Sequence, residues 1–144
     1  MTSATGALEP VAWILTHCRS IAVVGLSPHA HRASYGVSSY MQEQGYRIIP
    51  VNPNATVVLG QKAYATLTEA AQHEKIDLVN CFRNSAAIAP IVDEAIAIGA
   101  QAVWLQLGVT HEAALAKAAA AGLRVVQDRC IKVEHRARQP AALD

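Results

Sequence analysis

The stretch IAVVGLSPHAHRASYG, residues 21–36, decides the fold of this 144-residue chain. It opens with four consecutive apolar residues, Ile21–Val24, and this lack of alternation is typical of a strand buried on both faces. Gly25 then allows a sharp turn into a polar loop, and Ser34 is a residue type that caps helices. The stretch therefore predicts a strand, a loop of a size that suits a phosphate group, and an amphipathic helix.

The same alternation of apolar runs and helical patterns continues along the chain. The pattern predicts four further strands, at Tyr46–Val51, Ile76–Phe82, Ala100–Leu107 and Leu123–Gln127. It predicts helices over Pro10–Cys18, from Ser34 to Gly45, from Thr66 to near His73, from Asn84 or Ser85 to Gly99, and from Thr110 to Gly122. Residues 56–64 read as an irregular excursion with one extended segment, and one short helix is expected after Asp128.

Strands that alternate with helices and lack a period of two predict a parallel sheet covered on both faces. We therefore expect an α/β fold, a Rossmann-like doubly wound sheet of about five strands with helices on both faces. One domain over residues 1–144 is expected, with a core of about 9–136 and flexible termini. Ligands of such sheets bind beyond the carboxyl ends of the strands, which should bring together Ser27, Arg32, Asn52, Arg83, Gly108 and Asp128.

Composition and charge exclude several classes of protein. A net charge of +1 gives no broad attraction for polyanions, so we expect no binding to nucleic acid. Apolar runs are repeatedly interrupted, which argues against a membrane span, and residues 1–13 lack the features of a secretory signal. These observations predict a cytoplasmic protein without a membrane partner.

The three cysteines, Cys18, Cys81 and Cys130, lie far apart and show no CxxC spacing. This spacing argues against a disulfide framework and against a structural zinc site, and no other metal-binding motif is present. Cys81 ends an apolar run and is expected in the core. Cys130 follows Arg129, and a neighbouring cation favours the reactive thiolate.

The loop after Gly25 differs from a dinucleotide-binding loop. The G-x-G-x-x-G pattern is absent, and Asn52 occupies the place of the acidic residue that would bind an unmodified ribose, so NAD is disfavoured. Backbone N–H groups near Ser27 and Ser34, at the positive end of a helix dipole, and the cationic Arg32 still favour a diphosphate. The alternative is that Arg32 is solvated and the serines are plain helix caps.

Six blocks carry a resemblance to a known family: VVGLSPHAHRASYGV, GYRIIPVNP, LGQKAY, DLVNCFR, GAQAVWLQLGV and AGLRVVQDRCIKVEH. In this order the chain resembles the small stand-alone CoA-binding-domain proteins, which are related to the CoA-binding domain of the succinyl-CoA synthetase α subunit. The resemblance implies that coenzyme A or an acyl-CoA binds, with its diphosphate over residues 25–34 and its adenosine near residues 51–53. It does not carry ligase chemistry, because the synthetase has its phosphorylated histidine in a second domain.

The resemblance and the residues together give a set of candidate cofactor-binding residues. These are Gly25, Leu26, Ser27, Arg32, Ser34, Tyr35, Val51, Asn52, Pro53, Phe82, Arg83 and Gln106. Lys62 is a further cation expected near the phosphates, and His29 and His31 flank the loop as possible donors. Trp104, on the same strand face as Gln106, would flank the ligand or lie in the core.

Asp128, Cys130, Glu134 and His135 form a cluster with a catalytic composition. The alternative assigns Asp128 and Arg129 to a pair or cap at the end of the last strand and leaves His135 exposed on a tail helix. We favour this alternative and predict no catalytic residue.

The leading functional hypothesis is therefore binding of coenzyme A or an acyl-CoA without catalysis. The competing hypotheses are an enzyme that acts on a CoA thioester or disulfide through Cys130, and a nucleotide-sensing regulatory subunit. The sequence points to no particular protein partner.

Overall fold

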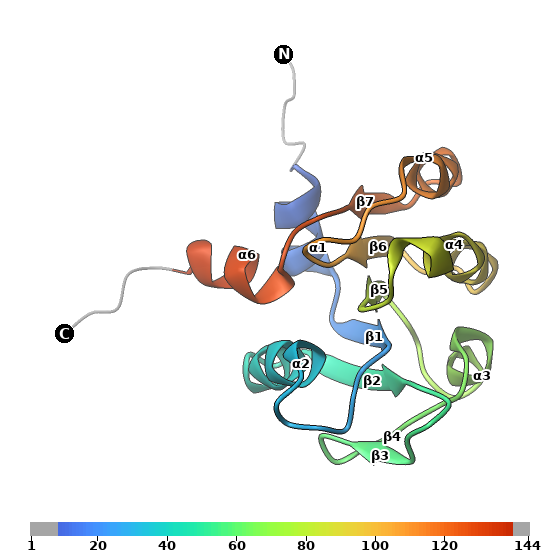
Figure 1. The fold of residues 1–144 in the computed structure, drawn as a ribbon. Coiled ribbons are helices and arrows are strands. Elements are labelled where there is room, and N and C mark those ends of the chain that lie inside the picture. The colour runs from blue at the N-terminus through green and yellow to red at the C-terminus, as the bar shows by residue number, and fades with distance from the viewer. Residues whose placement is uncertain (1–8, 140–144) are drawn as a thin grey trace.

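Five parallel strands form the sheet at the centre of the computed structural model, which describes residues 9–139 (Figure 1). The strands are β1 (Ser20–Val24), β2 (Arg47–Val51), β5 (Leu78–Cys81), β6 (Ala102–Leu105) and β7 (Arg124–Val126), in the order β2-β1-β5-β6-β7. This is the doubly wound α/β fold expected from the sequence, and each strand lies within its predicted range except β1, which begins one residue earlier.

Helices cover both faces of the sheet (Figure 1). The face to the left of the sheet in Figure 1 carries α1 (Pro10–His17), α2 (Ala33–Glu43) and α6 (Ile131–Ala137). The opposite face carries α3 (Leu67–Ala71), α4 (Ile88–Ala97) and α5 (Glu112–Ala120). A short 3₁₀ helix, η1 (Ser85–Ala87), precedes α4, and the two-stranded ladder of β3 (Val57–Val58) and β4 (Gln61–Lys62) lies in the segment predicted to be irregular.

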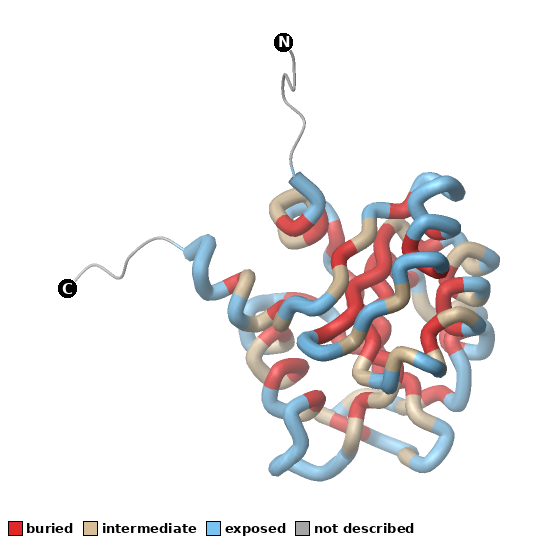
Figure 2. Tube along the Cα trace, turned by 45° about the horizontal axis from the view of Figure 1, so that its top comes forward, coloured by how far each residue is buried: buried red, intermediate tan, exposed pale blue. Residues whose placement is uncertain are grey.

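Strand β1 is buried along its whole length, which explains its unbroken apolar run. Ala22 and Val24 belong to the core under α3, α4 and α5, whereas Ile21 and Val23 belong to the core under α1, α2 and α6. Figure 2 shows the buried strands as a red centre enclosed by helices whose outer surfaces are exposed. Neither face of β1 meets water, so both sets of alternating side chains must be apolar.

Two predicted helix starts are wrong, and one is confirmed. Helix α2 begins after Arg32, and Ser34 lies inside its first turn, where its Oγ accepts the N–H of Ser27 at 3.0 Å. Helix α5 begins after His111 and not at Thr110; the Nδ1 of His111 accepts the N–H of Ala114 at 3.1 Å. Thr66, the predicted start of the third helix, caps α3 by accepting the N–H of Glu69.

None of the helices within residues 9–139 has the length and apolarity to cross a membrane. The expectation of flexible termini falls on residues 1–8 and 140–144, which lie outside the described residues.

His135 is buried, and the prediction that it is exposed on a tail helix is wrong. It is 7% exposed, and its Nδ1 lies 2.8 Å from the Tyr40 hydroxyl. The rings of Tyr40 and Tyr46 pack edge-on against its imidazole. Burial lowers the pKa of His135 below its ordinary value, because the charged imidazolium loses solvation. The charged groups nearby are Arg138, which pairs with Glu9 and Glu134, and Lys132, which lies over the Tyr40 ring.

The lowered pKa of His135 predicts a loss of stability in mild acid. The unfolded chain takes up a proton at this histidine at a higher pH than the folded protein does. The stability that depends on a neutral His135 should be fully present well above about pH 6.5, the pKa of histidine in the unfolded chain. The free energy of unfolding should fall as the pH decreases through that value.

Urea unfolding of the His135→Gln variant should therefore show a smaller loss of stability between about pH 7.5 and 5.5 than the wild type shows. The matched control is His31→Gln in the exposed loop, which should keep the wild-type dependence. An unchanged pH dependence in His135→Gln would contradict this role for burial.

Candidate functional site

Three strand ends meet at Gly25, directly after β1. The N–H of Gly25 donates to the carbonyl of Val51 at 2.9 Å, and the N–H of Phe82 donates to the carbonyl of Val24 at 2.9 Å. These bonds join the carboxyl ends of β1, β2 and β5. The chain leaves β1 for β2 on one side, and β5 returns on the other, so this is the switch point where doubly wound sheets form a crevice.

Glycine is required at position 25. Its φ is +89°, and a Cβ there would lie 2.5 Å from the carbonyl oxygen of Phe82. That oxygen belongs to the backbone of a central strand end and cannot rotate away as a side chain would. The backbones of Gly25 and Phe82 thus lie close together at the base of the crevice.

The loop from Gly25 to α2 is held by its own serines. Ser34 Oγ accepts the N–H of Ser27, and Ser27 Oγ accepts the N–H of His29, both at 3.0 Å. The N–H of Ser27 itself is therefore not available to a phosphate. Within the described chain, the N–H groups of Ala33 and Ser34 at the start of α2 have no acceptor.

Arg32 precedes these N–H groups and adds a positive charge. Its side chain is exposed and forms no ion pair with a described residue. The start of an eleven-residue helix, two free N–H groups and a guanidinium together form an anion-binding arrangement.

Asn52 ties the loop after β2 to the loop after β1. Its Nδ2 donates to the carbonyl of Leu26 at 2.9 Å, and its Oδ1 accepts the N–H of Asn54 at 2.8 Å. A carboxylate at this position could not donate to Leu26. The hydrogen bond to Leu26 is therefore a structural reason for a neutral amide at position 52, and the sequence alone did not reveal it.

Three adjoining hollows lie along this edge of the sheet. The loop hollow, about 360 Å³, is lined by Gly25, Ser27, Arg32, Ala33, Ser34 and Phe82. The β2 hollow, about 300 Å³, is lined by Val24, Gly25, Val51, Asn52, Pro53, Asn54, Ala65 and Arg83. The apolar hollow, about 450 Å³, is lined by Ala33, Val37, Phe82, Arg83, Gln106, Leu107, Val109 and Cys130.

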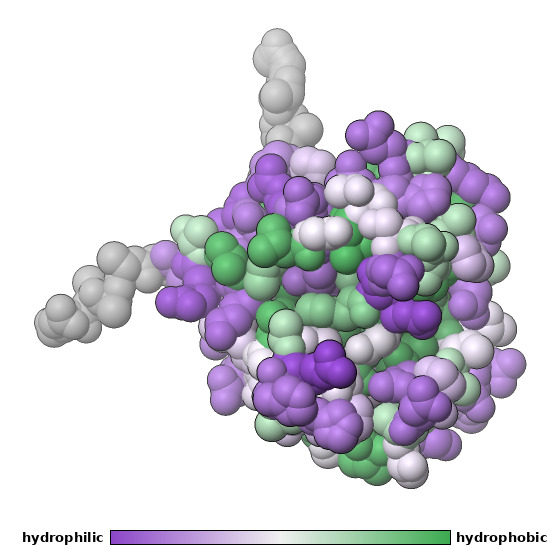
Figure 3. Space-filling model, in the orientation of Figure 1, coloured by the Kyte–Doolittle hydropathy of each residue, from purple (hydrophilic) through white to green (hydrophobic). Residues whose placement is uncertain are grey.

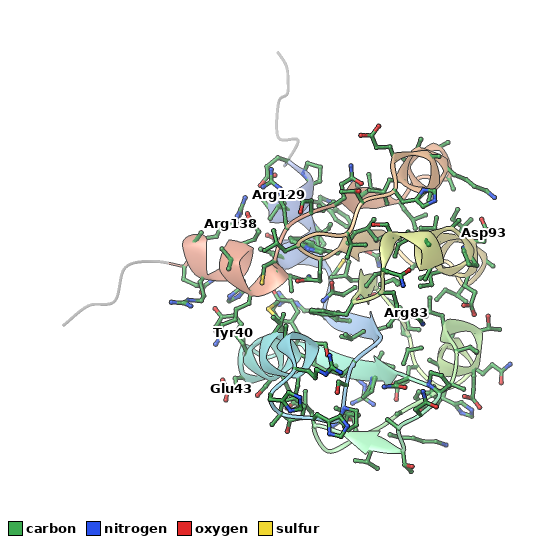
Figure 4. All side chains as sticks on the ribbon, in the orientation of Figure 1. Tyr40, Glu43, Arg83, Asp93, Arg129 and Arg138 are labelled. Atoms are coloured by element: carbon green, nitrogen blue, oxygen red, sulfur yellow. The ribbon has the colours of Figure 1, made fainter. Side chains whose placement is uncertain are left out.

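Shared walls make these hollows continuous. Gly25 lines both the loop hollow and the β2 hollow, while Ala33 and Phe82 line both the loop hollow and the apolar hollow. Arg83 borders the β2 hollow and the apolar hollow, and Figure 4 labels it between β1 and α4. Figure 3 shows apolar surface across this face, bordered by polar groups.

Of the twelve predicted site residues, all except Leu26 and Tyr35 line at least one of these hollows. Leu26 is fully buried, and Tyr35 is half-buried against the α2 side of the core. Lys62 lines none of the three; its Nζ lies 5.3 Å from the centre of the Tyr64 ring. Trp104 is fully buried in the core, where its Nε1 donates to the Arg129 carbonyl.

The sequence missed the apolar walls of the third hollow. Val37, Leu107 and Val109 carry no chemical motif. The signal that could have found Leu107 and Val109 is their place at the end of the fourth predicted strand and in the loop after it, since loops at that edge line the crevice.

The cluster with a catalytic composition is not assembled into one site. Asp128 Oδ1 accepts the N–H of Gly108 at 2.7 Å, so the expected role at the last strand's end holds, but its predicted partner Arg129 pairs with Glu134 instead. His135 contacts the Tyr40 hydroxyl. Of these residues, only Cys130 lines one of the three hollows.

Among residues 9–139, no group of three histidine, cysteine or acidic side chains is placed to hold a metal ion.

Comparison with known proteins agrees with this architecture. Residues 19–136 match the family described as CoA binding domain, so the chain belongs to that family. It is 42% identical over 122 residues to the uncharacterized protein YneT of Bacillus subtilis (strain 168), and the match covers 85% of this chain and 89% of that protein.

Solved structures share the fold. A hypothetical protein from Pyrococcus horikoshii OT3 is 35% identical, with a TM-score of 0.84 over 95% of this chain and 96% of that chain. The dinucleotide forming Acetyl-coenzyme A synthetase 1 of Ca. Korarchaeum cryptofilum has a TM-score of 0.70 at 20% identity, over 81% of this chain and 27% of that chain. At this lower identity the likeness concerns the fold alone.

The contact at Gly25 predicts opposite effects for two glycine substitutions. Gly25→Ala should lower the free energy of unfolding by about 2 kcal/mol or more, because the methyl group meets the Phe82 carbonyl at a positive φ. Gly36→Ala is the matched control: no atom lies within 4 Å of its Cβ position in α2, so it should gain about 0.5–1 kcal/mol. Urea unfolding measures both values, and equal effects of the two substitutions would contradict the contact.

Proposed function

We propose that this protein binds coenzyme A or an acyl-CoA across the three hollows and has no catalytic turnover of its own. The observation that carries the proposal is the start of α2, where Arg32 and the free N–H groups of Ala33 and Ser34 line one hollow. In a chain that belongs to the CoA-binding-domain family, a diphosphate is the anion that this arrangement would take.

The adenosine end would occupy the β2 hollow. Val51 and Pro53 offer apolar walls to a purine, and Arg83 offers a cation at the border of the hollow. Coenzyme A carries an additional phosphate on the 3′-oxygen of its adenosine ribose, whereas the adenosine ribose of NAD has free 2′- and 3′-hydroxyl groups. A neutral Asn52 avoids the repulsion that an acidic residue would exert on that phosphate.

Absence of turnover is supported by how the candidate catalytic groups are used. Asp128 accepts a backbone N–H, Glu134 pairs with Arg129 and Arg138, and His135 is buried against Tyr40. Each of these side chains already has a structural partner outside the hollows.

Isothermal calorimetry with CoA, acetyl-CoA and NAD tests the proposal. We expect binding of one or both CoA species and at least about 10-fold weaker binding of NAD, a difference of about 1.4 kcal/mol. Failure to bind any CoA species would overturn the proposal. Mass spectrometry of the protein purified under native conditions would identify a co-purified CoA species and its acyl group.

Substitution of Arg32 tests the diphosphate position. Arg32→Ala should weaken CoA binding by about 10- to 100-fold, because it removes a charge-assisted contact. Binding of 3′-AMP, which lacks the diphosphate, should change little. The control Lys62→Ala removes a cation that lines none of the hollows and should leave both ligands unaffected; equal losses of CoA and 3′-AMP in Arg32→Ala would undo the assignment.

A further inference from the structure

The apolar hollow contains a cysteine that the proposed function does not use. Cys130 is partly exposed and lines this hollow together with Phe82 and Ala33, the two residues that also line the loop hollow. A ligand whose diphosphate lies on the loop could therefore extend along a continuous surface to Cys130. The distal end of coenzyme A is a thiol on a slender pantetheine arm.

We propose that Cys130 captures coenzyme A covalently, as a mixed disulfide with the pantetheine thiol. This inference rests on the proposed binding of CoA and adds to it a thiol-modification site whose co-reactant is a CoA disulfide.

The walls of the hollow suit a pantetheine arm. Val37, Leu107 and Val109 offer apolar contacts to its methylene groups, and Leu107 is 71% exposed. Burial of this surface by the arm would be favourable, at about 25 cal/mol for each Å² removed from water.

Buried carboxamides provide a second, independent indication of a ligand. Gln106 is 4% exposed and lines the hollow; its Nε2 donates to Asn80 Oδ1 at 2.8 Å, while its Oε1 accepts no hydrogen bond from a described residue. Asn80 is 2% exposed and lines none of the three hollows, so the open group of this pair is Gln106 Oε1. Pantetheine carries two amide groups, and an N–H of either would be a donor for this oxygen.

The other two cysteines differ from Cys130 in access. Cys18 and Cys81 are fully buried, and burial raises the pKa of each thiol to about 12. Since the thiolate is the form that attacks a disulfide, these two cysteines should not react in the folded protein.

The reaction is a thiol–disulfide exchange. The Cys130 thiolate attacks one sulfur of CoA disulfide, and the protein–CoA S–S bond forms as the original S–S bond breaks. The other half leaves as a CoA thiolate, which takes up a proton from water. The disulfide supplies the oxidising equivalent, so no further oxidant is needed, and a dithiol reductant reverses the step.

Intact-mass spectrometry of the reduced full-length protein after incubation with CoA disulfide tests the inference. The expected product gains the mass of one CoA less two hydrogens, one from each thiol, and dithiothreitol removes it. Peptide mapping should place the adduct on Cys130, and Cys130→Ser should form none. An adduct on Cys18 or Cys81, or no adduct at all, would overturn the inference.

The rate of disulfide exchange distinguishes a cysteine beside a nucleotide-binding site from an ordinary exposed thiol. A bound nucleotide should hold the disulfide near Cys130, so CoA disulfide should react at least about 10-fold faster than 2-hydroxyethyl disulfide at equal concentration. Arg32→Ala should lose most of that preference without slowing the reaction with 2-hydroxyethyl disulfide. Equal rates of the two disulfides with the wild type would contradict the proposed geometry.

Two controls distinguish this inference from the proposed function. Cys130→Ser should still bind CoA reversibly in calorimetry; if the wild type binds CoA but forms no adduct, only the inference fails. If no CoA species binds, the proposed function fails as well. Acetyl-CoA, whose thiol is blocked, should leave no adduct, and acetylation of Cys130 would show acyl transfer in place of disulfide exchange and so overturn the inference.

Discussion

The close approach of Gly25 to the Phe82 carbonyl is the constraint on which the rest of the site depends. It brings the ends of β1 and β5 together, while the Gly25 N–H fixes the end of β2 through Val51. The chain can leave β1 in this direction only with a positive φ, and a side chain here would fill the space between two backbones. The loop, the start of α2 and the adjoining hollows all follow from that junction.

Much of the fold could be predicted because its signals are local. The apolar run of β1 and the glycines after α2, α4 and α5 mark element types and ends from neighbouring residues alone. The features that the sequence did not reveal depend on partners that are distant in the sequence. Ser34 bonds to a group seven residues away, Asn52 to one 26 residues away, and His135 to one 95 residues away. A residue type at one position cannot show which of several distant groups it will contact, and this is why the predictions for Ser34 and His135 are wrong.

The order of the elements predicted which residues lie together at this edge of the sheet, but it did not predict their contacts. Most of the chosen residues line the hollows because strand ends in a parallel sheet share one edge, and that rule needs only the order of elements. Only the structure shows which polar atoms already have a hydrogen-bond partner. The Ser27 N–H is occupied, whereas the N–H groups of Ala33 and Ser34 are open, so the anion-binding position shifts toward the helix start. In the proposed binding mode, the polar loop hollow would take the diphosphate of coenzyme A, and the apolar hollow beside it would take the pantetheine arm.

Amide chemical shifts in a ¹⁵N-labelled sample during titration with CoA test the central claim most directly. The account predicts that the N–H signals of Ala33 and Ser34 move furthest, because a diphosphate would accept hydrogen bonds from these two groups. Signals of Gly122 and Leu123, which line a separate hollow at the amino-terminal edge of β7, should stay in place. Large shifts at Gly122 and Leu123 with none at Ala33 and Ser34 would contradict the account.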